Sequence, residues 1–362
     1  MSKLAGESMS RARRRDRRVY LSGHPVLFTL LAATRRRPAR RLGGTVLAHS
    51  EAAVRDGLTR VPLDRNAPGT TGGAAGDLTG GELLFNQDGD GHRGSRRGLA
   101  LGADAVQRLR PVWTAVLDRR LAPLAAGERI ELVDVTAELA GATAAALLGV
   151  DADPLTLASM ARAAAAAAAR EHLPGIPRPG ARRAARAATA RLTDLLASHE
   201  DAALAAMLAV AAVTTTVAAL PRAAAWCADA GLWSFAGTAP DALTSELLRV
   251  TAPAPLLPRV AAAAGTVDGC PVRRGDRLIL VARHAVDAHR TDPCPADPAP
   301  PHVAQLVFGA GPHACPGARL ARHQLSDALR ALAVHRPRVV SARADRRSAL
   351  PGWSRLILAP DR

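Results

Sequence analysis

The feature that most constrains the fold of this chain is a glycine-rich run around Cys315. The run reads Phe308-Gly309-Ala310-Gly311-Pro312-His313-Ala314-Cys315-Pro316-Gly317, and an apolar helical pattern from Ala318 to Leu332 follows it. Glycines permit tight turns and a close approach of the backbone to a flat ligand. The amide groups and dipole of the following helix would favour a thiolate just before it. The run therefore predicts a tightly turned loop that presents Cys315 at a helix N-terminus.

The other cysteines narrow the chemistry open to Cys315. They are scattered and form no Cys-x-x-Cys pair, which argues against a zinc site or a dithiol redox motif and suits a reducing cytoplasm. If Cys315 stood without the rest of the run, a structural cysteine buried in a glycine-rich turn would be the better interpretation. However, six specified positions coincide in the run, a match that chance gives in about one chain in a million. We therefore favour a functional thiolate.

The rest of the chain predicts one mostly helical domain with a minor β component. Of its 362 residues, 48% are hydrophobic, and many of these are alanines, which favour helices. A continuous apolar helix from about Asp201 to Leu220 is expected to be buried through the middle of the domain. Short strands are expected at Thr45–Ala48 and between Pro258 and Val286. Residues 64–91 lack periodicity and are expected to form a long loop.

The N-terminal residues carry a dense basic run. Residues 1–18 are expected to form a basic disordered arm, followed by a single catalytic domain over residues 19–362. An apolar stretch after the arm resembles the start of a signal peptide, but Arg35-Arg36-Arg37 follows it without a cleavage pattern. No segment is expected to reach the apolar length that spans a bilayer. We therefore expect a cytoplasmic monomer with no membrane partner.

The run around Cys315 resembles the cysteine loop of the cytochrome P-450 superfamily, and it continues as Arg319-Leu320-Ala321-Arg322, as in soluble bacterial members. The resemblance implies a mainly α fold with a minor β component. A single triangular domain would hold haem b (iron-protoporphyrin IX) between the long central helix and the helix after the cysteine loop. The family's iron ligand maps onto Cys315, and a thiolate ligand favours O–O cleavage. The cofactor contacts implied within the loop are Phe308, Gly309, Gly311, His313 and Gly317.

Other matches to the family fall in the right order along the chain. Glu246-Leu247-Leu248-Arg249 fits its Glu-x-x-Arg pattern, which places Glu246 and Arg249 on one helix face as a structural ion pair. His92 and Arg96 resemble its His-x-x-x-Arg pair, and Arg259 resembles its strand arginine; the resemblance gives all three to the haem propionates. Each could equally be a surface residue in isolation, but two carboxylates in an apolar cavity need cationic partners.

The central helix departs from the family pattern. In the alignment that we favour, Thr215 takes the place of the family's alcohol and Thr214 replaces its acid, which makes both the candidate catalytic residues. The neighbouring register puts Val213 in the acid position, so neither register supplies a carboxylate. Three threonines in a helix can also simply bond back to the preceding turn. The missing carboxylate argues against ordinary hydroxylation but not against haem binding. The possible reactions include hydroxylation with substrate-assisted proton delivery, oxidative coupling and use of peroxide.

The charge balance bears on possible partners. Lys and Arg total 48 against 32 acids, a net charge of +16. Compositional bias of the source genome is the simplest explanation of this charge. A more specific explanation is that the chain binds an acidic partner, such as a small redox protein. Nucleic acid is not expected as a partner, because Tyr20 is the only tyrosine and the basic charge is not interleaved with stacking aromatics.

The resemblance implies a monooxygenase that oxidises a small, largely apolar secondary metabolite with O₂ and with electrons from a ferredoxin and its ferredoxin reductase. A haem-binding protein with little turnover is one alternative, because the proton relay is incomplete. A nucleotide-binding oxidoreductase is another, suggested by the Gly-x-Gly-x-x-Gly match over residues 89–94. That interpretation needs a preceding strand and a βαβ unit, whereas a loop is expected there.

Overall fold

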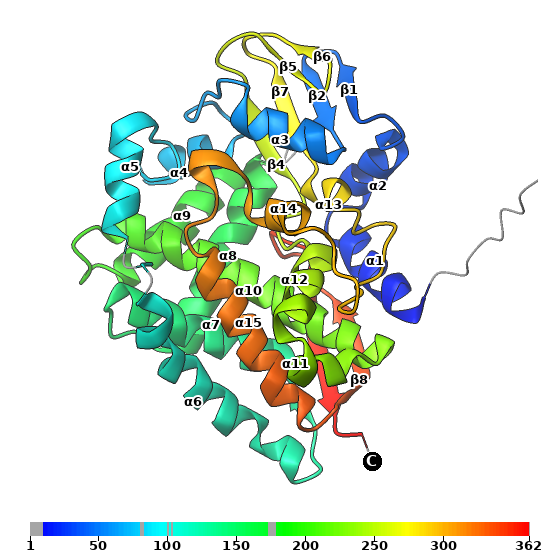
Figure 1. Cartoon of the computed structure of the whole chain (residues 1–362). Coiled ribbons are helices and arrows are strands. Elements are labelled where there is room, and N and C mark those ends of the chain that lie inside the picture. The colour runs from blue at the N-terminus through cyan, green and yellow to red at the C-terminus, as the bar shows by residue number, and fades with distance from the viewer. Residues whose placement is uncertain (1–9, 80–82, 100, 103, 173–178, 362) are drawn as a thin grey trace, which may run out of the picture.

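The helices of the chain gather around one long central helix, α10 (Ala202–Ala230), as Figure 1 shows for the computed structural model. The structure describes residues 10–79, 83–99, 101–102, 104–172 and 179–361. The other helices of eight residues or more are α1 (Arg11–Gly23), α2 (Pro25–Thr34), α3 (Glu51–Thr59), α4 (Thr71–Thr79), α5 (Gly89–Gly98), α6 (Ala105–Ala125), α7 (Leu132–Leu148), α8 (Pro154–His172), α9 (Ala181–Leu195), α12 (Pro240–Thr251) and α15 (Ala318–Ala333). Short helical turns are α11 (Phe235–Thr238), α13 (Ala282–Ala285) and α14 (Pro301–Ala304).

The central helix is longer than the sequence indicated. It was expected to end at Leu220, but it continues through Pro221 to Ala230, because the apolar side chains from Ala223 to Cys227 are all buried. A proline inside a helix removes one hydrogen bond, and this burial offsets that loss. By length and composition α10 could also cross a membrane, so the expectation that no segment reaches that length was wrong. In this fold α10 is surrounded by other helices, as the core helix of a globular domain would be. The helices that pack against α10 include α7, α8, α12 and α15.

The strands form small sheets at the edge of the helical mass (Figure 1). The largest has the order β1 (Ala39–Leu42), β2 (Thr45–Ala48), β7 (Arg277–Leu280) and β4 (Leu257–Val260), with β2 parallel to β7 and the other pairs antiparallel. A second sheet has the order β3 (Ile130–Glu131), β9 (Trp353–Ala359) and β8 (Arg338–Ala344), and β5 (Gly265–Val267) pairs with β6 (Cys270–Val272). The predicted fold class, mainly α with a minor β component, is confirmed.

Helix α1 contradicts the expected disordered arm over residues 11–18. Ser10 caps this helix by accepting a hydrogen bond from the Arg13 N–H at 3.1 Å, and Val19 and Tyr20 are buried. Asp16 is buried as well, and it forms ion pairs with arginines of the core. The basic run is therefore the solvent face of a helix whose other face packs against α10. Residues 1–9, the rest of the predicted arm, lie outside the described residues.

The segment expected as a long loop, residues 64–91, contains helix α4 and the start of α5. Thr70 caps α4 by accepting a hydrogen bond from the Gly73 N–H at 3.0 Å. A Cβ at Gly72 would lie 2.2 Å from the carbonyl oxygen of Arg65, and one at Gly73 would lie 2.1 Å from that of Ala67. The glycines that suggested a loop therefore allow the helix to pack tightly on the preceding chain.

Glu246 and Arg249 form a buried ion pair on α12. The Arg249 guanidinium donates to both Glu246 carboxylate oxygens, at 2.8 and 2.7 Å. The carboxylate also accepts the backbone N–H groups of Cys294 and Ala299, and Arg249 donates to the Val286 carbonyl. Burial alone would raise the pKa of Glu246, but Arg249 and the two N–H groups outweigh it and hold this pKa below its usual value. The pair thus fixes the irregular segment that leads toward the cysteine loop.

Candidate functional site

The cysteine loop connects α14 to α15 and is closed by its own backbone. The Cys315 N–H donates to the Phe308 carbonyl at 2.8 Å. Gly309 and Gly311 adopt φ angles of +78° and +72°, which side chains other than glycine rarely accept. A Cβ at Gly311 would also meet the Thr59 side chain at 3.2 Å. These glycines therefore let the chain turn sharply and bring Cys315 to the beginning of α15.

The Cys315 thiol is accessible but does not ionise readily by itself. The residue is exposed, and Gly317 lies beside its sulfur. The surrounding protein displaces water and raises the pKa of the thiol, while the Gly317 N–H and the positive charge of Arg96 only partly offset this effect. The thiol by itself therefore keeps its proton near pH 7. A bound metal ion would remove this proton, because a thiol that coordinates a metal is deprotonated outright.

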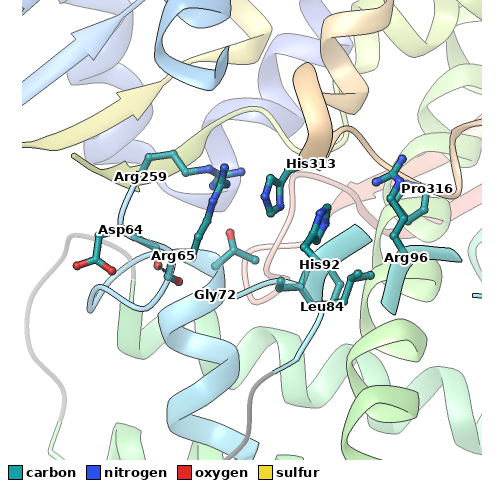
Figure 2. Close-up of a pocket in the computed structure, with 12 residues that line it drawn as sticks. Asp64, Arg65, Gly72, Leu84, His92, Arg96, Arg259, His313 and Pro316 are labelled. Atoms are coloured by element: carbon teal, nitrogen blue, oxygen red, sulfur yellow. Dashed lines mark hydrogen bonds between the residues drawn. The ribbon is translucent and has the colours of Figure 1, made fainter. Parts of the chain in front are cut away.

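Next to this loop, basic side chains converge on one pocket, which Figure 2 shows. It is lined by Arg96 and His92 of α5, Arg259 of β4, His313 of the cysteine loop, and Arg65, which precedes α4. The sequence had assigned the first four to the propionates. The structure brings those four together from three distant segments of the chain. Arg65 was not anticipated, because nothing in its immediate sequence distinguishes it from the other arginines.

Two of these arginines lack a full set of partners. In Figure 2 the guanidinium groups of Arg65 and Arg259 point toward each other. The Nε atom of each is buried and without a hydrogen bond, and Asp88 lies 4.0 Å from Arg65 Nε. Burial, with the charge of Arg65 adding to it, lowers the pKa of Arg259 to about 10. Two such cations side by side require an anion that the described residues do not supply in full.

The two histidines lie stacked beside the arginines. Their ring centroids are 3.8 Å apart, with an angle of 22° between the planes. Burial lowers the pKa of His313 to about 4 and also lowers that of His92. His313 Nε2 lies 3.4 Å from Asp88 Oδ1. Both rings are therefore neutral near pH 7, and each can donate one N–H to an anion in the pocket.

Arg96 connects this pocket to the cysteine loop. Its Nη1 donates to the carbonyl of Ala314, the residue before Cys315, at 2.5 Å. Helix α5 thereby holds the loop in place with the same side chain that faces the pocket. The Gly-x-Gly-x-x-Gly match lies in this helix, from Gly89 onward. The described residues before it form α4 and a turn rather than a strand, so the nucleotide-binding interpretation has no structural support.

A second cavity lies between the central helix and the helix after the cysteine loop. Its lining combines Thr215 and Thr216 of α10 with Phe308, Ala321 and apolar side chains of α12 and α15. Thr214, the other candidate catalytic residue, does not line this cavity. The Arg322 guanidinium packs 5.1 Å from the centre of the Phe308 ring and donates to Gln305. Phe308 thus contacts a cation with its ring and also lines the cavity.

The threonine hydroxyls already have acceptors. Thr214 Oγ1 donates to the Val210 carbonyl at 2.6 Å, and Thr215 Oγ1 donates to the Ala211 carbonyl at 2.8 Å. This is the back-bonding that a run of threonines allows. Thr215 keeps its oxygen lone pairs free to accept from a water in the cavity, but its proton is committed to the helix. It can therefore orient a water better than it can deliver a proton.

Solved structures resemble the chain over almost its whole length. The P-450 EryK mutant in complex with erythromycin B matches with a TM-score of 0.73 and 20% identity, over 94% of this chain and 97% of the other. The chain has the cytochrome P-450 fold. OxyD, which is involved in the biosynthesis of vancomycin-type antibiotics, matches with a TM-score of 0.69 and 21% identity over 96% and 97%. The ligand-free CYP164A2 of Mycobacterium smegmatis matches with a TM-score of 0.71 and 23% identity over 92% and 99%. No family model and no curated protein matches the sequence.

Proposed function

We propose that this chain is a cytochrome P-450 monooxygenase that binds haem b, with Cys315 as the residue that would ligate the iron. The observation that carries the proposal is the pocket beside the cysteine loop, where three arginines and two histidines converge and two buried Nε atoms lack a hydrogen bond. A dicarboxylate such as a haem supplies the missing acceptors. The position of the pocket also supports the proposal, because His313 and Pro316 of the cysteine loop line it.

The residues present fit this group. Arg65, Arg96, Arg259, His92 and His313 would hold its carboxylates, and Phe308 would lie against the cysteine ligand. When bound, the haem supplies an iron that activates O₂. Cys315 would donate electron density through sulfur, and the closed loop and Arg96 would hold that sulfur at one position. The Glu246–Arg249 ion pair would keep the supporting segment ordered beneath the loop.

The substrate that we propose is a small, largely apolar secondary metabolite. The cavity next to Thr215 is lined mainly by alanine, leucine, proline and phenylalanine side chains. Such a lining favours apolar ligands and leaves few groups that fix orientation. Two similar structures are consistent with this substrate class: EryK, whose mutant was solved in complex with erythromycin B, and OxyD, which is involved in the biosynthesis of vancomycin-type antibiotics.

A measurement of substrate turnover distinguishes the proposed monooxygenase from the alternative function, a haem protein with little activity that serves as a sensor or scaffold. The purified protein is screened against apolar metabolites for a shift of its visible spectrum, and each binder is then incubated with a ferredoxin, ferredoxin reductase and NADPH. We expect at least one oxidised product that depends on the protein and on O₂. A haem spectrum with no substrate-dependent product from any binder would favour the alternative.

We predict poor coupling between electron consumption and product formation. The Thr214 and Thr215 protons are both bonded to carbonyls, and no carboxylate stands in the acid position. With a substrate that has no polar group near its reacting carbon, most reducing equivalents should appear as peroxide. Thr214→Asp should raise the product fraction by up to about tenfold, less than the roughly hundredfold or more that a well-placed general acid contributes, because residue 214 does not line the cavity. Product and peroxide are measured against the NADPH consumed.

Two further variants complete that experiment. Thr215→Ala should lower the product fraction, because it removes the acceptor for an ordered water. Thr193→Ala removes a hydroxyl that back-bonds within α9, outside the cavity lining, and should leave coupling unchanged. Tight coupling in the wild type that neither Thr214→Asp nor Thr215→Ala alters would mean that protons arrive by another route.

The electron donor that we propose is an acidic ferredoxin, served by its reductase in the cytoplasm, and it would dock near the cysteine loop. Arg93, Arg97 and Arg319 are exposed there, whereas Arg322, which the sequence also suggested, is half-buried against Phe308. Reduction should slow by about tenfold between low and high salt, because surface steering is screened. Stopped-flow reduction measures the rate. Arg97→Glu should slow it at low salt, and the exposed Arg186→Glu on α9 should not. A salt-independent rate would exclude this docking mode.

A further inference from the structure

Away from the proposed haem site, buried polar atoms without hydrogen bonds surround one small cavity. The cavity lies between α1, α10 and the start of β9. It is lined by Ala12, Arg15, Asp16, Arg222, Ala225, Trp226, Asp229 and Trp353. Five of these residues each place a buried side-chain atom there without a hydrogen-bond partner, namely Arg15 Nη1, Arg222 Nη2, Trp226 Nε1, Asp229 Oδ2 and Trp353 Nε1.

The lining is deeply buried, so bulk water cannot satisfy these atoms. Arg222, Trp226 and Trp353 are only 1%, 2% and 3% exposed. A buried donor without an acceptor costs about 1–3 kcal/mol. The cavity leaves about 10 Å³ for the centre of a water-sized sphere, which is room for roughly one water molecule or one small ion. A single bound species must therefore serve several groups at once.

Donors outnumber acceptors around the cavity. The two indole N–H groups can donate into the cavity. The two guanidinium nitrogens lie at ion-pair distance from carboxylates, Arg222 Nη2 from Asp16 and Arg15 Nη1 from Asp229, but each carries two N–H groups and makes no hydrogen bond of good geometry. Asp229 Oδ2 is the one acceptor without a hydrogen bond among the described lining atoms. A water molecule accepts two hydrogen bonds and would leave two donors without a partner. A halide ion accepts from all four. The Asp229 carboxylate opposes an anion, but Arg15 Nη1 lies 3.0 Å from that same oxygen and offsets its charge.

The local charge also favours an anion. Asp16 pairs with two buried arginines, with Oδ1 at 2.6 Å from Arg222 Nη2 and Oδ2 at 2.7 Å from Arg283 Nη2. Asp229 pairs with Arg15 and, at 3.6 Å, with the exposed Arg11. Even without Arg11, three arginines face two carboxylates, which leaves one positive charge in excess. An uncompensated charge in a protein interior is strongly unfavourable.

From these contacts we propose that this cavity binds a monovalent anion of halide size, which is chloride in the cell. The anion would accept hydrogen bonds from α1, α10 and β9 and so tie the N-terminal helix to the core. The site has no part in the proposed oxidation and stands or falls independently of it.

Thermal unfolding of the haem-loaded protein tests this proposal. Its midpoint is measured in sodium bromide and in sodium gluconate at equal ionic strength, since gluconate is too large for the cavity. Bromide should raise the midpoint by roughly 3–6 °C at a hundredfold excess over its dissociation constant, with saturation. Crystals grown in bromide should show one anomalous-scattering peak between the Trp226 and Trp353 indoles.

Matched tryptophan variants separate the site from general salt effects. Trp353→Phe and Trp226→Phe each remove one N–H and keep the ring, so both should reduce or abolish the bromide-dependent rise. Trp233→Phe should keep it, because the Trp233 N–H donates to the Pro337 carbonyl elsewhere. Equal midpoints in bromide and gluconate for the wild type, or a cavity that holds water only in the bromide crystals, would overturn the proposal even if the variants do not fold.

Discussion

Replacing both Arg65 and Arg259 by leucine is expected to weaken haem retention by roughly a hundredfold or more. Each arginine would lose a charge-assisted hydrogen bond to a carboxylate, which is worth about 1.5–3 kcal/mol. Each single variant should therefore lose about tenfold to a hundredfold. The measurement is the rate at which the holoprotein releases haem to an excess of a haem-scavenging acceptor protein.

Stability without haem distinguishes binding from a structural role. The Nε atoms of both arginines lack hydrogen bonds, and burial lowers the pKa of Arg259. Their removal should therefore not destabilise the haem-free protein. Arg274→Leu, a change at an exposed residue in the turn before β7, is the matched control and should alter neither quantity. Unchanged haem release in the double variant would reject this assignment.

Replacing Glu246 by glutamine is expected to lower the midpoint of thermal unfolding by roughly 4–7 °C. The change leaves Arg249 buried with only neutral partners and weakens the contacts that hold Cys294 and Ala299. Breaking a buried ion pair from one side costs about 3–5 kcal/mol, which corresponds to a shift of this order. Differential scanning calorimetry of the haem-loaded protein measures the midpoint.

The pH dependence of that effect has a definite sign. The pKa of Glu246 is lowered in the folded protein, so its contribution is complete above the ordinary value of 4.5 and is lost as the pH falls through the lower folded-state pKa. The difference between Glu246→Gln and wild type should therefore be full at pH 7 and shrink in acid. Glu51→Gln breaks a partly exposed pair with Arg55 on α3 and should shift the midpoint by at most about 1 °C. Equal shifts in both variants would contradict the special role of Glu246.

The parts of the fold predicted well from the sequence are those with local signals. The cysteine loop, the Glu246–Arg249 spacing and the apolar central helix all rest on residues close together in the chain. The fold class followed from them and from the alanine-rich composition. The end of α10 was missed because Pro221 normally indicates a boundary, and only the buried surroundings of the following turns explain why the helix continues.

The missed parts depend on contacts between distant segments. Helix α1 was predicted to be a basic arm because nothing in its own sequence indicates that Asp16 is buried. The arginines that pair with Asp16 lie on α10 and α13, more than 200 residues away. Arg65 could not be chosen among the many arginines, since its role appears only where β4, α5 and the cysteine loop meet. The glycines of α4 indicated a loop, and their close contact with the preceding carbonyls shows instead why a helix needs them there.

The absorbance of the reduced protein with carbon monoxide tests the central claim most directly. We predict the red-shifted band of a haem bound through a thiolate for the wild type and for Cys294→Ser, which changes an exposed cysteine outside the loop. Cys315→Ser should lose that band, because an alcohol oxygen replaces the sulfur ligand. An identical spectrum for the wild type and Cys315→Ser, or no haem absorbance in the wild type, would contradict the account.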